Sequence, residues 1–368
     1  MNSINGKKTA EALVSVLKNA DSVEKSALLG FDACIDTLVS VVKQRHDDGS
    51  DEYYSSPGEL GGVLLKLGTK SCGLELKTKI SRPGGNMAIT ANALGRLGVK
   101  ADCIGTFGYP DINPVYRAIS PACTLHTVAD TITATALEFD VSKIIIFDPG
   151  PYNHLSWEDI VEIVSIDQLK KLASGKKLIS FLNWSEIANS TSIWKRFLDD
   201  IFSGLPQGDK KIFFTDFSDC SRKSKSEITE ATEILHTYRK YFRVVLSLNV
   251  NESLLVAKAL GVKESGSDEQ FLETMHKACN VDIILIHRIN DALAYDGSQC
   301  VSCDTFFTGE PKILTGGGDN FNAGFCYSSF FDLDLSSSLL LANSVAGYYV
   351  REGHSPDIDG LVNFLSEV

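Results

Sequence analysis

The chain has 368 residues, of which 35 are basic and 47 are acidic, so its formal net charge is −12. A nucleic-acid-binding protein usually carries a basic balance, so this composition argues against a nucleic-acid partner, although not against a local site for an anion. Hydrophobic residues make up 43% of the chain and no run of 18 apolar residues occurs, which excludes a disordered chain and a membrane-spanning one.

Nine cysteines are present, an odd number that does not suit a small disulfide scaffold. Most stand among apolar neighbours, so we expect reduced, mostly buried thiols in a cytoplasmic protein. The CxxC sequence at Cys300 and Cys303 lacks a second pair and a nearby histidine, so we do not expect zinc or redox chemistry there. The first 20 residues lack the apolar segment of a secretory signal.

In the first 150 residues, the patterning predicts a helix, a strand and then a flap. Apolar residues at helical spacing indicate a helix at about 7–20, and a short buried strand follows at 26–30. Residues 43–83 are first polar and glycine-rich and then alternating, which favours loops and exposed strands over core. A small-residue helix after Gly84 leads into a strand at 102–105, and residues 123–147 alternate as antiparallel strands do.

The remaining chain alternates helices and short apolar strands. Apolar runs of four to six residues between helices are typical of parallel strands covered on both faces. We therefore predict one α/β domain over residues 1–368, with a mostly parallel central sheet flanked by helices and a small β-rich lid. Strands are expected at 177–182, 211–214, 243–248 and 282–286, and helices at 159–173, 192–202, 226–240, 251–260, 319–331 and 336–351.

The strongest local signal is the sequence TGGGDNFNAGF at 315–325. Gly316, Gly317 and Gly318 allow a tight turn, and the helix that follows presents free N–H groups and the positive end of its dipole to an anion. Asp319 at this position would suit a general base that takes a proton from an attacking hydroxyl. The alternative is a plain glycine loop in which Asp319 only caps the helix.

Two further segments carry polar groups that could bind a polyol. Gly84 and Gly85 would let a ligand approach the backbone, and Asn86 offers both a donor and an acceptor. Asp32 and Asp36 follow the first strand, at the carboxyl end where α/β sheets place ligands. The alternatives are a structural turn with an Asx cap and two solvated carboxylates.

Several common signatures are absent. The chain has no GxxxxGK[ST] phosphate loop, no GxGxxG dinucleotide fingerprint, no HExxH and no GxSxG. No protein-held metal centre is therefore predicted.

The order of these motifs resembles the PfkB family of carbohydrate kinases, which have the ribokinase-like fold. AITANALGRLGVKADCIGTFG at 88–108 is similar to the family's first signature, and TGGGDNFNAGF is similar to its second. Asn343 and the segment from Arg351 to Gly353 resemble the family's C-terminal, nucleotide-side segment. Two signatures in the correct order, about 230 residues apart, are far more specific than either alone.

The resemblance implies roles for individual residues. Asp319 would be the catalytic base, and the N–H groups of Gly316 to Gly318 would form an anion hole for the transferred phosphoryl group. Mg²⁺ would bridge the phosphates of ATP, and segments 37–83 and 122–140 would form a lid that excludes water. The sugar would be held by Asp36, Gly84, Gly85 and Asn86, and the nucleotide side would include Asn251, Glu252 and Asn343.

The chain departs from the family pattern in three places. Ile313-Leu314 replaces an Asp-Thr pair that often serves a monovalent cation, so potassium activation is not expected. The family's Asn-x-x-Glu, which is linked to Mg²⁺, could be read from Asn251, which puts a leucine at the last position, or from Asn249, which puts Glu252 there. His287-Arg288 stands where a Thr-x-Gly usually lines the nucleotide.

Three functions remain open at this point. The leading one is an ATP-dependent sugar kinase acting on a primary hydroxyl of a monosaccharide or close relative. A nucleoside kinase is the alternative, for which Tyr53, Tyr54 or Phe107 could clamp the base. A non-catalytic homologue that binds sugar or nucleotide is the third. The lid also makes a homodimer plausible.

Overall fold

The computed structural model describes residues 2–3, 6–140, 142–205, 211–264 and 266–367. Within these ranges, ten strands form one large sheet in the order β1-β15-β14-β13-β12-β11-β10-β2-β6-β7. Among the described strand pairs of this sheet, β13–β14 and β14–β15 are antiparallel, and the others are parallel. The strands are β1 Asn2–Ser3, β2 Ser26–Phe31, β6 Lys100–Gly105, β7 Cys123–Thr127, β10 Leu178–Phe181, β11 Lys211–Asp216, β12 Phe242–Asn249, β13 Ile283–His287, β14 Asp291–Tyr295 and β15 Cys300–Asp304.

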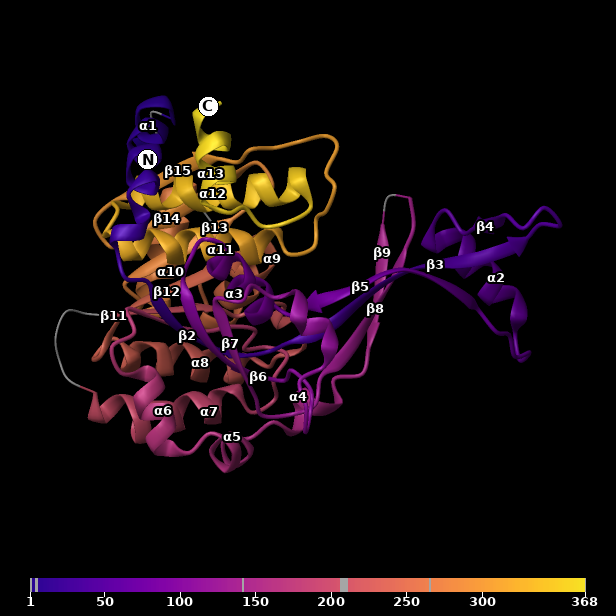
Figure 1. The fold of residues 1–368 in the computed structure, drawn as a ribbon, viewed down its shortest axis with the longest axis horizontal. Coiled ribbons are helices and arrows are strands. Elements are labelled where there is room, and N and C mark those ends of the chain that lie inside the picture. Colours follow the sequence, from indigo (N-terminus) through magenta and orange to yellow (C-terminus); the bar gives the residue numbers. More distant parts are fainter. Residues whose placement is uncertain (1, 4–5, 141, 206–210, 265, 368) are drawn as a thin grey trace.

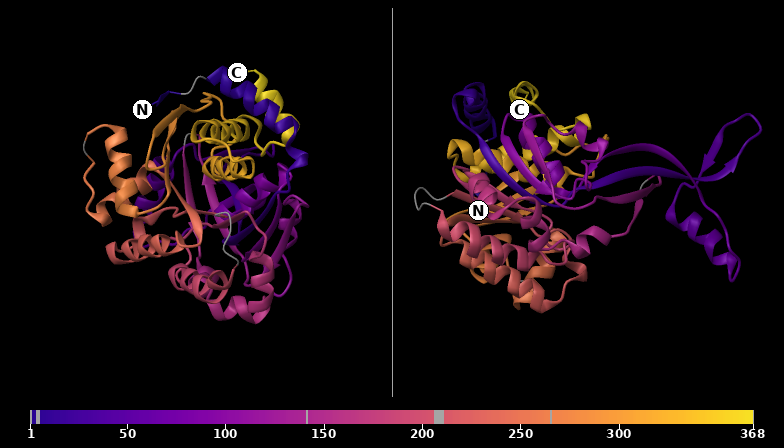
Figure 2. Two further views of the ribbon diagram at one scale, coloured as in Figure 1. Left: turned by 90° about the vertical axis from the view of Figure 1, so that its left-hand side faces the viewer. Right: turned by 60° about the horizontal axis from the view of Figure 1, so that its bottom comes forward.

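Helices cover both faces of this sheet (Figures 1 and 2). The strands are apolar on both faces, so each face must be covered. On β12, for example, Val244 and Leu246 pack into the core cluster on one face, and Val245 packs into the cluster on the other. One face carries α1 Gly6–Lys18, α3 Asn86–Arg96, α11 Gly317–Ser328, α12 Leu335–Glu352 and α13 Ile358–Ser366; the other carries α4 Gly150–His154, α5 Trp157–Ile163, α6 Ile166–Ala173, α7 Ser190–Arg196, α8 Lys225–Tyr238, α9 Val250–Leu260 and α10 Asp268–Cys279.

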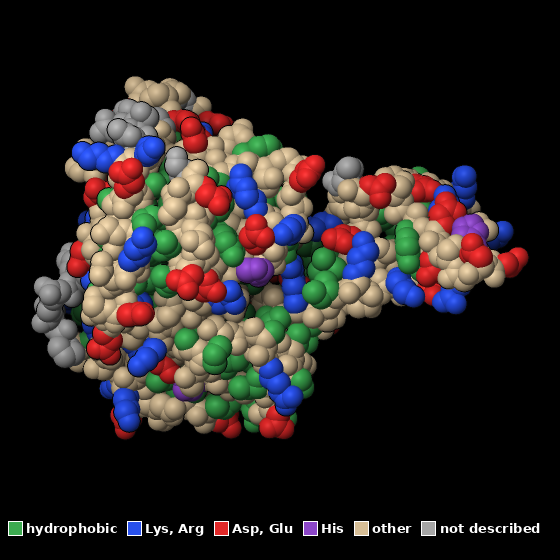
Figure 3. Space-filling view, turned by 45° about the horizontal axis from the view of Figure 1, so that its top comes forward, with side chains coloured by type: hydrophobic (Ala, Val, Ile, Leu, Met, Phe, Trp, Pro, Cys, Tyr) green, Lys and Arg blue, Asp and Glu red, His purple; other side chains and the backbone are tan. Residues whose placement is uncertain are grey.

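A second, five-stranded sheet forms the lid. Its order is β4-β3-β8-β9, and β5 also pairs with β3. It projects from the body as a separate lobe whose tip carries charged side chains of both signs (Figures 2 and 3). Its elements are β3 Cys34–Arg45, β4 Asp51–Tyr53, α2 Pro57–Leu67, β5 Glu75–Gly84, β8 Ile132–Glu138 and β9 Lys143–Phe147.

The parallel sheet, its flanking helices and the lid agree with the predicted fold class. Three local predictions need correction. Helix α2 lies in the flap, where only loops and strands were expected, and its start is set by a Ser56 cap with Pro57 behind it. The helix expected at 159–173 is two helices, because Ser165 caps a new one. Strand β7 pairs parallel with β6, and β8 pairs parallel with β3. Among the described residues of 123–147, the antiparallel pair is β8–β9.

These pairings also change the extent of the lid. The second lid segment was expected at 122–140, but β7 at its start belongs to the large sheet, and β9, beyond its end, belongs to the small one. The N-terminal helix lies at the expected place.

The cysteines are free thiols, and Cys72 is the exposed one among them. Cys300 and Cys303 lie on β15 and pack into the core clusters on opposite faces of the sheet, so the CxxC sequence does not bring its two sulfurs together. Among the helices that the structure describes, none combines the length and apolar character needed to cross a bilayer.

Candidate active site

A cavity of about 200 Å³ lies between the carboxyl ends of the central strands and the lid. From the body, Asn86, Asn183 and Asp319 line it; from the lid, Ile145 and Phe147 on β9 do so. This is the edge at which α/β sheets place ligands, next to the point where the chain switches sides of the sheet between β2 and β10. The cavity brings together four of the residues predicted for the site: Asp36, Gly85, Asn86 and Asp319.

Asp319 lies in the first turn of α11 and is 9% exposed. Burial raises the pKa of its carboxyl group well above the usual range, and the negative charges of Asp216, Asp32 and Asp36 raise it further. A hydrogen bond from the side chain of Asn86 acts in the opposite direction. A buried carboxyl group with a raised pKa is suited to accept a proton from a hydroxyl group that is held beside it.

The glycine turn before α11 lies between Thr315 and Asp319, which both line the same cavity. Gly316 has a φ of 94°, and a Cβ atom there would lie 2.8 Å from the Tyr349 hydroxyl. The Gly317 N–H donates to the Leu314 carbonyl, so this predicted anion donor is already engaged. The first intrahelical bond runs from Asn320 to Gly316. The N–H groups of Gly318 and Asp319 therefore point out of the helix end as the donors available to an anion.

Asp32 holds the start of helix α3. Its two carboxylate oxygens accept from the Asn86 N–H at 2.6 Å, the Met87 N–H at 2.8 Å and the Asn183 amide at 2.9 Å. A Cβ atom on Gly85, whose φ is 93°, would lie 2.9 Å from the Asp32 oxygen. Gly85 therefore makes room for this carboxylate, and the two residues together fix where Asn86 stands.

Asp36 has few partners within the protein. Its described hydrogen bond comes from the Cys34 thiol at 3.5 Å. Burial raises the pKa of Asp36, whereas the positive charges of Arg82 and Lys143 lower it. A Cβ atom on Gly84 would lie 2.4 Å from the Asp36 carboxyl carbon, so Gly84 supplies space for Asp36. The Asp36 oxygens are left available to a ligand in the cavity.

Behind Asp319 lies a buried polar cluster that the sequence reasoning missed. Asp216, at the end of β11, accepts from the Asn322 amide at 2.7 Å, and Ser247 donates to the Asn322 oxygen at 2.7 Å. His287 Nε2 lies 4.0 Å from the Asp216 carboxylate, and burial lowers the pKa of this imidazole. Asp216 lies two residues after the strand predicted at 211–214, as Asp32 lies two residues after the strand predicted at 26–30, and that position was the available signal.

The structure favours one of the two ways to place Asn-x-x-Glu. Asn249 caps α9 and accepts from the Glu252 N–H at 3.0 Å, while the Glu252 carboxylate accepts from the Asn249 N–H at 2.8 Å. Glu252 is buried, and burial followed by the charge of Asp216 raises its pKa to about 9. Asn251 is exposed. Asn249 and Glu252, at the ends of the Asn-x-x-Glu spacing that starts at Asn249, are therefore joined by reciprocal hydrogen bonds at the start of α9.

Asn343 has a structural role that was not expected. Its amide donates to the carbonyls of Cys303 at 3.0 Å and Asp304 at 3.1 Å, which ties α12 to the end of β15. It is 2% exposed and does not line the cavity. The amide of Asn343 is thus engaged by two backbone carbonyls, and its contact with a nucleotide stays a prediction.

The residues present fit a nucleotide-borne Mg²⁺ better than a protein-held metal. Within the described ranges, no three His, Cys, Asp or Glu side chains are grouped so that they could hold an ion. Glu252 and Asp216 nevertheless place two acidic groups close together, and their interaction raises the pKa of Glu252. Mg²⁺ commonly keeps its waters, takes most of its ligands from substrate phosphates and uses one or two carboxylates.

The aromatic clamp considered for a nucleoside does not form. Tyr53 lies on β4 at the far part of the lid, Tyr54 packs inside the lid, and Phe107 packs in the body core. None of the three lines the cavity.

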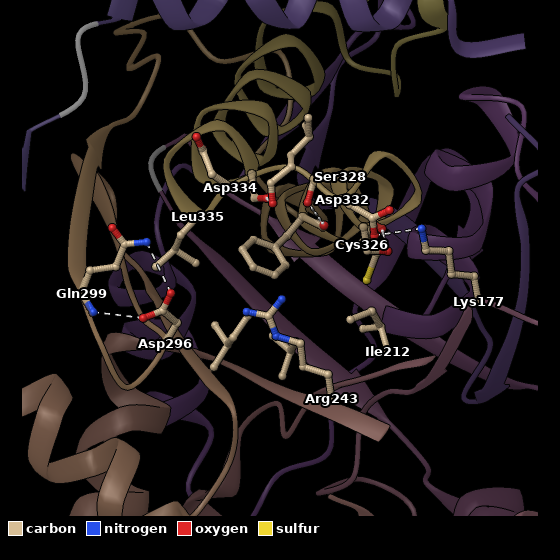
Figure 4. A pocket seen from close by; sticks show the side chains of 16 residues that line it. Lys177, Ile212, Arg243, Asp296, Gln299, Cys326, Ser328, Asp332, Asp334 and Leu335 are labelled. Carbon is tan, nitrogen blue, oxygen red and sulfur yellow. Dashed lines mark hydrogen bonds and ion pairs between the residues drawn. The ribbon is translucent and has the colours of Figure 1, made fainter. Parts of the chain in front are cut away.

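A second cavity, of about 270 Å³, lies at the opposite edge of the sheet (Figure 4). Lys177 pairs with Asp332 at 3.0 Å, and Asp296 accepts from the Gln299 N–H at 3.0 Å. No residue predicted for catalysis lines it. The predicted residues Asp36, Gly85, Asn86 and Asp319 instead line the smaller cavity beneath the lid.

Comparison with known proteins agrees with this geometry. The ribokinase of Thermotoga maritima superposes with a TM-score of 0.63 at 16% identity, covering 93% of this chain and 99% of that one. Arabidopsis thaliana ribokinase, solved with ribose and ATP, gives a TM-score of 0.63 at 15% identity over 93% of this chain and 99% of that one. At these identities the likeness establishes the ribokinase-like fold.

Sequence comparison narrows the family. A ketohexokinase of Haloferax volcanii is 25% identical over 347 residues, covering 92% of this chain and 90% of that protein. The family model for prokaryotic ketohexokinase matches residues 7–368. The resemblance to carbohydrate kinases of the PfkB type is thereby confirmed: the chain belongs to the prokaryotic ketohexokinase family.

Proposed function

We propose that the protein transfers the γ-phosphoryl group of ATP to a primary hydroxyl of a ketohexose. The observation that carries this proposal is the position of Asp319, a buried carboxyl group at the N-terminal end of α11 that shares a cavity with Asp36 and Asn86. Family membership and the curated ketohexokinase relative support the ketose as acceptor. ATP is supported by the ribokinase of the same fold that was solved with it.

The transfer follows from the groups in the cavity. The sugar hydroxyl oxygen attacks the γ-phosphorus and forms the new P–O bond, while the bond to the leaving ADP oxygen breaks. Asp319 takes the hydroxyl proton. The N–H groups of Gly318 and Asp319, with the dipole of α11 behind them, face the negative charge on the transferred group. Asp36 and Asn86 hold other hydroxyls of the sugar and thereby orient the attacking one.

Mg²⁺ would neutralise charge on the nucleotide phosphates when it is bound. Glu252 and Asp216 are the residues that would hold it, through its waters or directly. Their burial keeps these oxygens away from bulk solvent.

The lid would close the cavity from water and also form a homodimer contact. On β9, Ile145 and Phe147 line the cavity, and Ile144 and Ile146 alternate to the other face. All three isoleucines are exposed. Ile80 on β5 adds to the exposed apolar surface of the lid. A second copy of the chain would cover this surface; a monomeric mass by analytical ultracentrifugation would contradict that part of the proposal.

The proposal is tested by a phosphoryl-transfer screen. Purified protein with ATP and Mg²⁺ is offered ketohexoses, aldohexoses, pentoses and nucleosides, and ADP release is measured. We expect ketohexose-dependent ADP formation above the rate without acceptor. Preferential use of a nucleoside would favour the alternative kinase, and binding of sugar without ADP formation would favour the non-catalytic homologue.

The raised pKa of Asp319 predicts a pH dependence. Asp319 accepts a proton only when ionised, so kcat/KM rises with pH through its pKa, with a midpoint above about 4, the ordinary value for aspartate. Among the neighbouring charges, that of Asp216 has the largest effect in raising the pKa of Asp319. Asp216→Asn removes that charge and should move the acid limb to lower pH, whereas Asp332→Asn, beside the distant cavity, should leave it in place. A limb that stays in place or moves upward in Asp216→Asn would contradict the assignment.

A further inference from the structure

Strand β9 of the lid reaches the glycine turn of the body through Lys143. The Lys143 ammonium donates a hydrogen bond to the Thr315 hydroxyl, although the two residues are 172 positions apart. Thr315 directly precedes Gly316 and lines the same cavity as Asp36 and Asp319. The ammonium group therefore lies beside a residue of the cavity wall that directly precedes the glycine turn.

A second lid cation lies beside the first. Arg82 on β5 stands opposite Asp36 in the pairing of β3 with β5. Its positive charge lowers the pKa values of Asp36, Lys143 and Tyr349. The Tyr349 hydroxyl donates to the Thr315 carbonyl at 2.8 Å. Lys143 thus contacts the residue before the glycine turn, and Arg82 acts electrostatically on Lys143 and on Tyr349, which also contacts that residue.

The cavity needs such charges, because its other ionisable groups are acidic. Asp32, Asp36 and Asp319 all line it, and a phosphoryl group entering among carboxylates would be repelled. Other lid lysines do not meet this need: Lys79 pairs with Glu138 at 2.9 Å, half-exposed on the lid.

We propose that Lys143 is a catalytic residue that contacts the transferred phosphoryl group, with Arg82 beside it. This inference rests on the proposed kinase function and adds to it. When the sugar oxygen forms its bond to phosphorus and the bond to ADP breaks, the charge on the phosphoryl oxygens is met from the body by backbone N–H groups and from the lid by the Lys143 ammonium. The proton still goes to Asp319, and Lys143 gains or loses none.

The lid cation also gives a reason for lid closure beyond the exclusion of water. Lys143 reaches Thr315 only from β9, so its charge is present at the transfer site when the lid lies over the cavity. Movement of the lid away from the body would remove this charge from the site.

The test compares Lys143→Met with Lys143→Arg and with the matched lid control Lys79→Met. We expect Lys143→Met to lower kcat about 10²-fold or more, the scale seen when one transition-state donor is removed. The Kd of fructose, measured by titration calorimetry in the absence of nucleotide, should change less than about threefold, because the lost contact is made in the transition state. Lys143→Arg should recover part of the rate, and Lys79→Met should behave as wild type.

Two results would overturn the inference. One is a kcat for Lys143→Met within about threefold of that for Lys79→Met. The other is a loss of fructose affinity with kcat unchanged, which would make Lys143 a sugar ligand. A wild-type protein that transfers no phosphoryl group would instead refute the proposed function, and this inference with it, so the two failures are distinguishable.

Discussion

Asp319→Asn is expected to lower kcat by about 10²–10⁴-fold, the usual range for loss of a general base. The amide fills the same volume but cannot take up the proton of the attacking hydroxyl. Because asparagine is uncharged, it also relieves the repulsion from Asp216, Asp32 and Asp36 that raises the pKa of Asp319. The fold should therefore be retained or slightly stabilised, and steady-state kinetics with a thermal melt would show both effects.

A matched control separates this effect from a general one. Asp167 is exposed on α6, on the far side of the body, and Asp167→Asn should leave kcat unchanged. An Asp319→Asn enzyme that keeps more than about a tenth of the wild-type kcat would remove Asp319 from the role of base.

Asp32→Ala should lower the free energy of unfolding by about 3 kcal/mol or more, since three buried or partly buried donors lose their acceptor at about 1 kcal/mol or more each. These are the N–H groups of Asn86 and Met87 and the amide of Asn183. The loss falls at the start of α3, so sugar binding through Asn86 should weaken as well. Urea denaturation, with the slope checked against wild type, gives the measurement.

Asp36→Ala is the matched comparison four residues along the chain. Its carboxylate has one weak described partner, so stability should change by less than about 1 kcal/mol. Sugar affinity should nevertheless fall by about 1–3 kcal/mol, because sugar hydroxyls lose their acceptor. A larger loss of stability in Asp36→Ala than in Asp32→Ala would reverse the roles that the structure gives the two residues.

The fold and the centre of the site could be predicted because their signals are local. Strands β10, β11 and β12 are short, largely apolar runs between helices, and the glycine turn with Asp319 is continuous in sequence. The start of α2 also has a local signal, the Ser56 cap followed by Pro57. Gly61 and Gly62 inside the helix have low helix propensity, so the sequence did not predict a helix there.

Contacts between distant segments could not be predicted in this way. The bond between Lys143 and Thr315 depends on how the lid lies over the body, and the cluster of Asp216, Ser247 and Asn322 depends on the order of strands in the sheet. Composition and residue spacing indicate neither the position of the lid over the body nor the order of the strands. Only assembly of the sheet brings these side chains to one edge.

The glycines before α3 show a different limit. Gly84 and Gly85 were predicted to lie against a sugar, and the sequence indeed marks them as a place of close approach. The structure shows that the groups that approach are the carboxylates of Asp36 and Asp32. A glycine pair predicts that something comes close to the backbone, but not whether it is a ligand or another side chain.

The central claim is phosphoryl transfer to a primary hydroxyl of a ketohexose, and ³¹P NMR of the reaction products tests it most directly. Wild-type protein is incubated with fructose, ATP and Mg²⁺. The account predicts a new phosphate-ester signal, split by two neighbouring hydrogens as a CH₂–O–P group requires, that grows in step with ADP and grows at least about 10²-fold more slowly with Asp319→Asn. Inorganic phosphate alone, or no reaction with any ketohexose while ATP binds, would contradict it.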